Sequence, residues 1–292
     1  MPRHARKEVI VTTFHKLLRA GPRVLAAALL SALATTLAAQ DGIGSLLVAP
    51  TRVVFSGTRR TAEISLINTG NRAATYRISL VRLRMSERGD VQEITEGRPD
   101  ERFADALVRF SPQQVTLEPR VAQTVRIALR APADLETGEY RSHLLFRELP
   151  SSDAPATESQ AQGVSIRLIP IFGISIPVIV RHGALPSLLV LEGPRLVDSA
   201  PGEQTLEVTL RREGGSSVYG NLEVTYLPAT GGRVEVGRVQ GVAVYTPNLS
   251  RLVRIPLHRL EVGALVRGRL EVTFVATDAV TPMVALSEIA LP

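Results

Sequence analysis

Residues 164–181 read VSIRLIPIFGISIPVIVR. Every second residue of this stretch, from Val164 to Val180, is apolar or proline. Side chains alternate between two faces along a β-strand, so this spacing predicts a long strand with one continuous apolar face. Pro170 and Pro177 have no N–H group to donate to a neighbouring strand, which indicates the edge of a sheet and not its centre.

Such an edge is unusual, because proteins normally cover an exposed apolar strand or blunt it with charge. The pattern therefore favours a strand that is kept available for a partner and binds it by strand addition. The alternative is an ordinary sandwich edge that is covered by a second domain or by the polar residues 150–163, which we expect to be mobile.

Around this strand, short β-rich segments alternate with turn residues throughout the chain after residue 40, and helical periodicity is scarce. This pattern predicts an all-β fold of sandwich type. The composition changes at residues 181–186 (RHGALP), where we expect a hinge. The domain organisation predicted from this is a first sandwich at 41–182 and a second, smaller one at 183–292.

The first 39 residues are expected to be a cleaved signal peptide. An Ala- and Leu-rich segment, residues 24–39, follows a basic start and ends in small residues that suit cleavage after Ala38 or Ala39. An N-terminal membrane anchor is the alternative, but the apolar segment is short for a bilayer span. No second apolar segment follows, so we expect the mature chain to be exported and to carry no integral membrane segment.

Charge and cysteine content exclude several functions. The chain has 34 Lys and Arg against 28 Asp and Glu, and residues 1–39 contain six of the former and one of the latter. The remaining residues are therefore near a net charge of +1, so nucleic acid is not an expected partner. The chain contains no cysteine, which excludes disulfides and thiolate metal sites.

Catalysis is not expected either. The three histidines after residue 40, His143, His182 and His258, lack metal-ligand spacing. Neither a nucleophile elbow nor a phosphate-binding loop is present. We expect no catalytic residues, no metal and no cofactor, and we expect His143 to be a packed or surface residue of a strand.

The order of several segments resembles the PapD-like periplasmic chaperones of pilus assembly, the chaperone–usher family. The resemblance covers nearly all of the first predicted domain and is weaker in the second. It rests on APTRVVFSGTRRTAEISLINTGNRAATYRISL at 49–80, FSPQQVTLEPRVAQTVRIAL at 110–129, GEYRSHLLF at 138–146, ISIPVIVRHG at 174–183 and VAVYTPNLSRLVRIPL at 242–257. It implies two immunoglobulin-like β-sandwich domains set at an angle.

The resemblance also implies site residues. The family inserts alternate side chains of an edge strand into an incomplete subunit, and it anchors the subunit's C-terminal carboxylate with an arginine and a lysine. Arg52 matches the arginine, and Arg181 is a neighbour that could assist it. The lysine is missing, with Pro177 at its position, or Arg167 in a shifted register that we disfavour. The expected donor residues are Val164, Ile166, Leu168, Pro170, Phe172 and Ile174.

The resemblance implies a periplasmic chaperone that stabilises fimbrial or pilus subunits by donor-strand complementation and delivers them to an outer-membrane usher. Its edge strand could also pair with a second copy of the chain. The alternative is an exported structural or adhesive β-sandwich module with no role in pilus assembly. The chain contains no Trp and few aromatic residues, which disfavours binding of sugars.

Overall fold

The computed structural model of the chain describes residues 45–150, 157–161, 164–168, 171–200, 203–258, 267–277 and 283–291. In residues 157–161 and 164–168 the backbone alone is described. The predicted signal peptide at 1–39 lies outside these residues. The described residues belong to one compact unit. Within the described ranges, none of the residues forms a helix that is long and apolar enough to cross a membrane.

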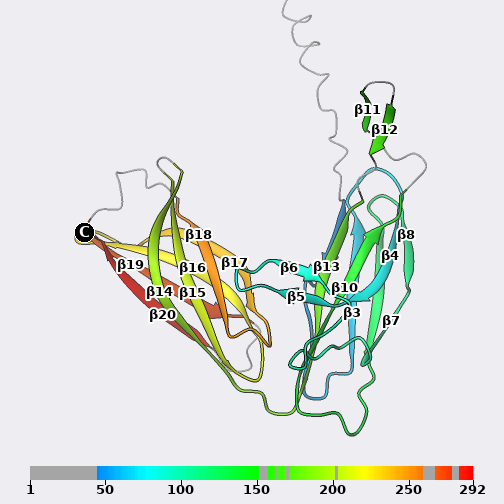
Figure 1. Cartoon of the computed structure of the whole chain (residues 1–292), viewed down its shortest axis with the longest axis horizontal. Coiled ribbons are helices and arrows are strands. Elements are labelled where there is room, and N and C mark those ends of the chain that lie inside the picture. Colours follow the sequence, from blue (N-terminus) through cyan, green and yellow to red (C-terminus); the bar gives the residue numbers. More distant parts are fainter. Residues whose placement is uncertain are drawn as a thin grey trace, which may run out of the picture. The chain divides into compact units, whose positions relative to one another are not determined.

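The first sandwich consists of two sheets that enclose one apolar core (Figure 1). In spatial order the four-stranded sheet is β1 (Leu46–Ala49), β3 (Thr61–Asn68), β9 (Ala122–Leu129) and β7 (Val108–Ser111). The five-stranded sheet is β2 (Val53–Phe55), β13 (Gly173–His182), β10 (Gly138–Glu148), β4 (Ala74–Val81) and β8 (Gln114–Leu117). Two hairpins extend from it: β5 (Leu83–Met85) with β6 (Val91–Glu93), and β11 (Thr157–Ala161) with β12 (Val164–Leu168).

The second sandwich has its own core, which includes Leu206, Leu222 and Phe274, all without exposed surface. One sheet is β14 (Ser187–Ala200), β15 (Glu203–Gly214) and β18 (Ser250–Pro256). The other is β17 (Val234–Val244), β16 (Val218–Pro228), β19 (Gly268–Ala276) and β20 (Val284–Leu291). The expected all-β class with two sandwiches is therefore confirmed.

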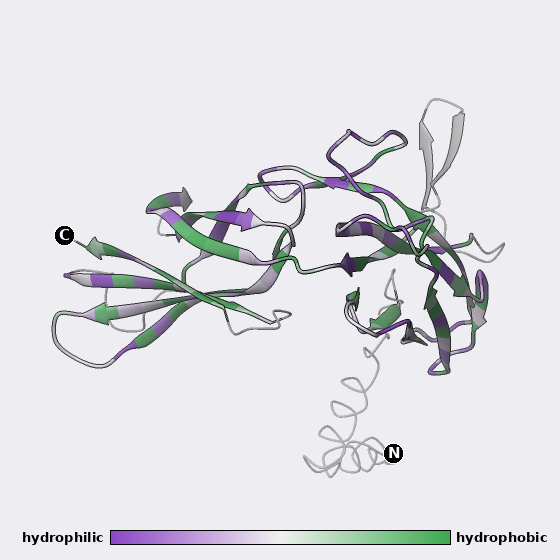
Figure 2. Cartoon of the chain, turned by 90° about the horizontal axis from the view of Figure 1, so that it is seen from below, coloured by the Kyte–Doolittle hydropathy of each residue, from purple (hydrophilic) through white to green (hydrophobic). Residues whose placement is uncertain are grey.

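Alternation of apolar and polar residues explains why these segments are strands. Along β3, buried and more exposed residues alternate, and Ile64 and Leu66 have no exposed surface. Figure 2 shows the same change between hydrophobic and hydrophilic colours along strands of both sandwiches. Each strand thus has one face for the core and one for solvent or for a neighbouring element.

The structure corrects the prediction of one continuous strand over residues 164–181. Two strands are present, β12 up to Leu168 and β13 from Gly173, and they have different partners. Thr157–Ala161, expected to be mobile, forms β11 and pairs with β12. β10 ends where β13 begins, because Arg147 pairs with Gly173 and the Glu148 N–H donates to the carbonyl of Phe172. Alternation continued across this change of partner, so the sequence pattern did not reveal it.

The chain also changes sheets between β1 and β2. β1 pairs with β3 in one sheet, whereas β2 pairs in parallel with β13 in the other. Residues 50–52 make this crossing. The crossing places Arg52 directly before β2, beside β13.

We predict that Leu144→Ala, in the middle of β10, will destabilise the first sandwich. Leu144 has no exposed surface and belongs to its core, so truncation removes buried apolar contacts and leaves a cavity. The expected loss is about 2–5 kcal/mol in the free energy of unfolding, measured by chemical denaturation. Leu145→Ala is the matched control, because its side chain points to the other face and is only half-buried. Equal losses for the two variants would contradict the assignment of the core face.

Candidate functional site

The edge of the five-stranded sheet is open along part of β13. On one side, β13 pairs with β10 from Gly173 to His182. On the other side, within the described residues, β2 pairs only with Val178–Val180. The backbone of Gly173–Pro177 therefore has a neighbouring strand on one side alone, and we call this segment the open edge. A strand of another chain could add here by backbone hydrogen bonding.

Apolar side chains stand exposed at the beginning of this edge. Phe172 and Ile174 retain 38% and 36% of their surface, and Ile171 is exposed as well. Farther along the same face of β13, Ile176, Val178 and Val180 are buried in the first core. One face of the strand thus serves the core at one end and reaches solvent at the other.

The structure describes the predicted donor residues unequally. Val164, Ile166 and Leu168 lie in β12, where the backbone pairs with β11 and the side chains are outside the described atoms. Pro170 lies outside the described residues. Phe172 and Ile174 are therefore the donor residues whose exposure is described.

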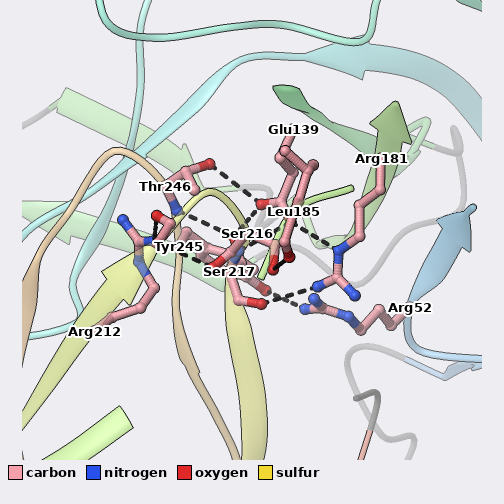
Figure 3. Close-up of polar contacts among 10 residues, drawn as sticks. Arg52, Glu139, Arg181, Leu185, Arg212, Ser216, Ser217, Tyr245 and Thr246 are labelled. Carbon is pink, nitrogen blue, oxygen red and sulfur yellow. Dashed lines mark hydrogen bonds and ion pairs between the residues drawn. The ribbon is translucent and has the colours of Figure 1, made fainter. Parts of the chain in front are cut away.

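A buried carboxylate links the two sandwiches (Figure 3). Glu139 of β10 has a side chain with no exposed surface, and it pairs with Arg181 at 2.9 Å. From the second sandwich, Ser217 donates to this carboxylate through its backbone N–H at 2.9 Å and through its hydroxyl, and the Thr246 hydroxyl donates at 3.2 Å. We call this arrangement the Glu139 bridge. Its donors satisfy both carboxylate oxygens, which a buried charge requires.

Two arginines bind backbone carbonyls around the Glu139 bridge. Arg181 also donates from Nη2 to the Ser217 carbonyl at 2.9 Å, so it binds both sandwiches. Arg212, which is 2% exposed, donates to the carbonyls of Gly214, Ser216 and Asn248. These bonds hold the loops that carry Ser217 and Thr246, as the close-up in Figure 3 shows. We expected Arg181 to assist in binding a subunit carboxylate, but in the structure it pairs with Glu139, a carboxylate of its own chain.

A second group of basic residues lies beside the bridge. Arg52, Arg141 and His143, here called the basic cluster, all contact tyrosines of the second sandwich. The Arg52 guanidinium lies 4.6 Å from the centre of the Tyr219 ring. The Arg141 guanidinium lies 4.2 Å from the Tyr245 ring centre, and the His143 ring meets that ring edge-on at 6.2 Å. Cation–π contacts of this kind attract a guanidinium to an aromatic face.

Burial governs the electrostatics of the basic cluster. It lowers the pKa of Arg141, with Arg52 acting in the same direction. It also lowers the pKa of His143 to about 3, with further lowering by the positive charges of Arg141 and Arg52. His143 is therefore neutral near pH 7. Burial raises the pKa of Tyr245, which keeps that hydroxyl neutral.

The resemblance predicted Arg52 as a site residue, but the sequence analysis did not identify Arg141. Arg141 and His143 lie two residues apart in GEYRSHLLF, on the face of β10 that also carries Glu139. Three polar residues at alternate positions, followed by the apolar residues LLF, were the available signal. Across the sheet His143 pairs with Pro177, the position at which the family's lysine was expected. Of the two expectations for His143, a packed or a surface residue, its 4% exposure corresponds to the packed one.

The β5–β6 hairpin forms another link between the sandwiches. The Leu252 N–H of β18 donates to the Glu87 carbonyl at 2.7 Å, and the Asn248 amide donates to the Met85 carbonyl at 2.9 Å. Met85 is buried with Ile179, Ala243 and Tyr245 in a small apolar cluster shared by both sandwiches. Polar and apolar contacts thus act together at this junction.

Among the described residues, no group of three or more His, Asp or Glu side chains could hold a metal ion. Titratable groups instead gather at the junction formed by the Glu139 bridge and the basic cluster. Hydrogen bonds, an ion pair and cation–π contacts join the two sandwiches there.

Comparison with known proteins bears on the fold. No sequence model of a protein family matches the chain, and no curated protein matches it by sequence. Similar solved structures include the YadV chaperone, with 13% identity and a TM-score of 0.43, covering 84% of this chain and 100% of that one.

Two further structures are similar to the same extent. One is the CsuC–CsuE complex of a chaperone and a tip adhesion subunit from the archaic Csu pili of Acinetobacter baumannii, with 14% identity, a TM-score of 0.42, and coverage of 85% and 99%. The other is the Pseudomonas aeruginosa CupB2 chaperone, with 15% identity, a TM-score of 0.39, and coverage of 84% and 100%.

We predict that Glu139→Gln will destabilise the protein strongly. The substitution leaves the partly buried Arg181 without its opposite charge and exchanges one acceptor oxygen for an amide donor. Removing one member of a buried ion pair typically costs about 3–5 kcal/mol, which denaturant unfolding would detect. Glu63→Gln is the control, because its pair with Arg126 at 3.1 Å is largely exposed, and such pairs contribute about 0–1 kcal/mol. A loss at Glu139 as small as that at Glu63 would refute the role assigned to the bridge.

We also predict that His143 will make the protein less stable in mild acid. Its pKa is about 3 in the folded chain, against the model-compound value of 6.5. Between these values the unfolded chain binds a proton that the folded chain excludes, so stability falls as the pH drops below 6.5. The limiting slope for one such group is about 1.4 kcal/mol per pH unit.

The measurement is the free energy of unfolding from pH 7.5 to 4.5 for the native chain, His143→Gln and His258→Gln. Below pH 6.5 the curve of His143→Gln should be flatter, whereas that of the control, altered at an exposed residue, should follow the native chain. Parallel curves for all three proteins would show that His143 is not buried in its neutral form.

Proposed function

We propose that this chain is an exported, non-enzymatic chaperone of the periplasm that captures subunits of a surface fibre and delivers them to an outer-membrane usher. The observation that supports this most directly is the open edge of β13. A strand that is fully paired on one side and open over Gly173–Pro177 on the other can accept an extended segment of a partner.

The side chains at the open edge suit an apolar partner. Phe172 and Ile174 are exposed next to a backbone that can form hydrogen bonds, so a subunit lacking a strand could gain both contacts at once. Burying one such side chain contributes about 1.5–3 kcal/mol. The resemblance implies that Val164, Ile166, Leu168 and Pro170 also bind the subunit, the first three of them from the separate strand β12.

Arg52 is the proposed anchor for the subunit's C-terminal carboxylate. It directly precedes β2, which pairs with β13 beyond the open edge, so a partner strand added there would run toward it. Its Nη1 lies 3.4 Å from the Tyr245 hydroxyl, a long contact that a carboxylate would replace with a charge-assisted hydrogen bond. Arg181, bound to Glu139, would act on the subunit only indirectly.

We predict that Phe172→Asp will abolish subunit capture while the free protein stays folded. The side chain is exposed and outside the core, but a carboxylate there cannot enter an apolar groove. The assay is a pull-down of the tagged protein from the periplasm of its own host, with the eluted proteins identified and their stoichiometry measured. Val121→Asp is the matched control, an exposed apolar residue in the turn before β9.

Support for the proposal would be one small subunit bound at one-to-one stoichiometry by the native chain and by Val121→Asp, lost in Phe172→Asp and weakened in Arg52→Ala. Equal capture by Phe172→Asp would refute the assignment of the open edge. Capture unchanged in Arg52→Ala would remove the anchor alone. A native chain that elutes alone, even with co-expressed fibre subunits, would indicate a structural or ligand-binding module, and a native dimer would indicate self-pairing of the edge.

A further inference from the structure

Arg141 is a buried cation without a matching anion. It is 9% exposed, and its Nε and Nη1 atoms are buried without a hydrogen-bond partner. The neighbouring His143 is 4% exposed, and its Nδ1 atom is buried without a partner as well. Buried polar nitrogens are normally hydrogen-bonded, and buried charges are normally paired. We therefore expect a hydrogen-bond acceptor, from outside the chain, beside Arg141 and His143.

The acidic residues near Arg141 are already engaged. Glu139 and Glu101 are the carboxylates whose charges act on it. Glu139 accepts hydrogen bonds from Arg181, Ser217 and Thr246. Glu101 pairs with Arg84 at 2.6 Å. Neither carboxylate has Arg141 as its partner.

The surrounding groups add positive charge and do not balance it. Arg52 and Arg251, together with Arg141, act electrostatically on Tyr245. Tyr245 offers its ring face to Arg141 and Arg52, but as a neutral phenol it supplies no negative charge. A small anion would be stabilised by the summed field of three guanidinium groups at a site of low dielectric constant.

We propose that Arg141 and His143 form a binding site for a small anion of single charge, such as chloride or acetate, which the free protein takes up from solution. Single charge fits a site in which the anion binds one guanidinium, that of Arg141, beside a neutral imidazole. Small size fits nitrogens that are shielded from solvent beneath the Tyr245 ring, where a nucleotide or a lipid headgroup would not reach. The inference stands apart from the proposed function, since it concerns the protein alone.

The test is a titration of the purified protein with sodium acetate, and separately with sodium chloride, at constant ionic strength and pH 7. Thermal unfolding reports binding to the folded state. Acetate or chloride should raise the melting temperature along a saturable curve. At ten times the dissociation constant, the unfolding equilibrium constant should fall about elevenfold. The two salts distinguish a carboxylate site from a halide site.

Arg141→Gln should abolish the saturable response, and Arg141→Lys should retain it with lower affinity. Arg147→Gln is the matched control, since Arg147 lies on the same strand but is exposed and outside the cluster. If Arg141→Gln does not fold, the line width of chloride-35 or the chemical shift of labelled acetate, compared between the native chain and Arg141→Lys, gives the same comparison. A native chain without a saturable response to either salt would overturn the proposal. An equal response in Arg141→Gln would place anion binding elsewhere.

Discussion

The junction of the two sandwiches depends on one buried carboxylate. Glu139 has no exposed side-chain surface, and its donors come from both sandwiches: Arg181 from the first, Ser217 and Thr246 from the second. A buried charge is tolerated only when it is paired and hydrogen-bonded, so the loops that supply these donors must keep their places. Arg212 holds those loops through their carbonyls, and the tyrosines that cover the basic cluster are positioned with them.

β10 explains why the open edge and this junction lie so close together. One face of the strand packs into the first core through Leu144 and Phe146, and the other carries Glu139, Arg141 and His143 toward the second sandwich. The same strand pairs with β13 along its whole length and so holds the open edge in place. A partner added to β13 would therefore extend a sheet whose outer face is already fixed by the junction.

Much of the fold was accessible from sequence, because alternation and turn residues are local signals. The all-β class and the two sandwiches followed from them. The division of residues 164–181 into β12 and β13 did not, since it depends on pairing with β11 on one side and β10 on the other. The candidate site could be predicted only in part. Arg52 was identified through a resemblance. Arg141 was not, because its role depends on contact with Tyr245, which lies 104 positions later in the chain and in the other sandwich.

The hairpin contacts have a consequence for how this sequence can vary. Met85 and Glu87 reach the second sandwich through their carbonyl oxygens, which accept from Asn248 and Leu252. A carbonyl is present whatever residue occupies the position, so evolutionary drift in the side chain of Glu87 would leave its backbone contact intact. Insertion or deletion of a residue between Met85 and Glu87 would instead change the spacing of the two acceptors along the chain. Among relatives of this chain, that spacing should be preserved more strictly than the side chain of Glu87.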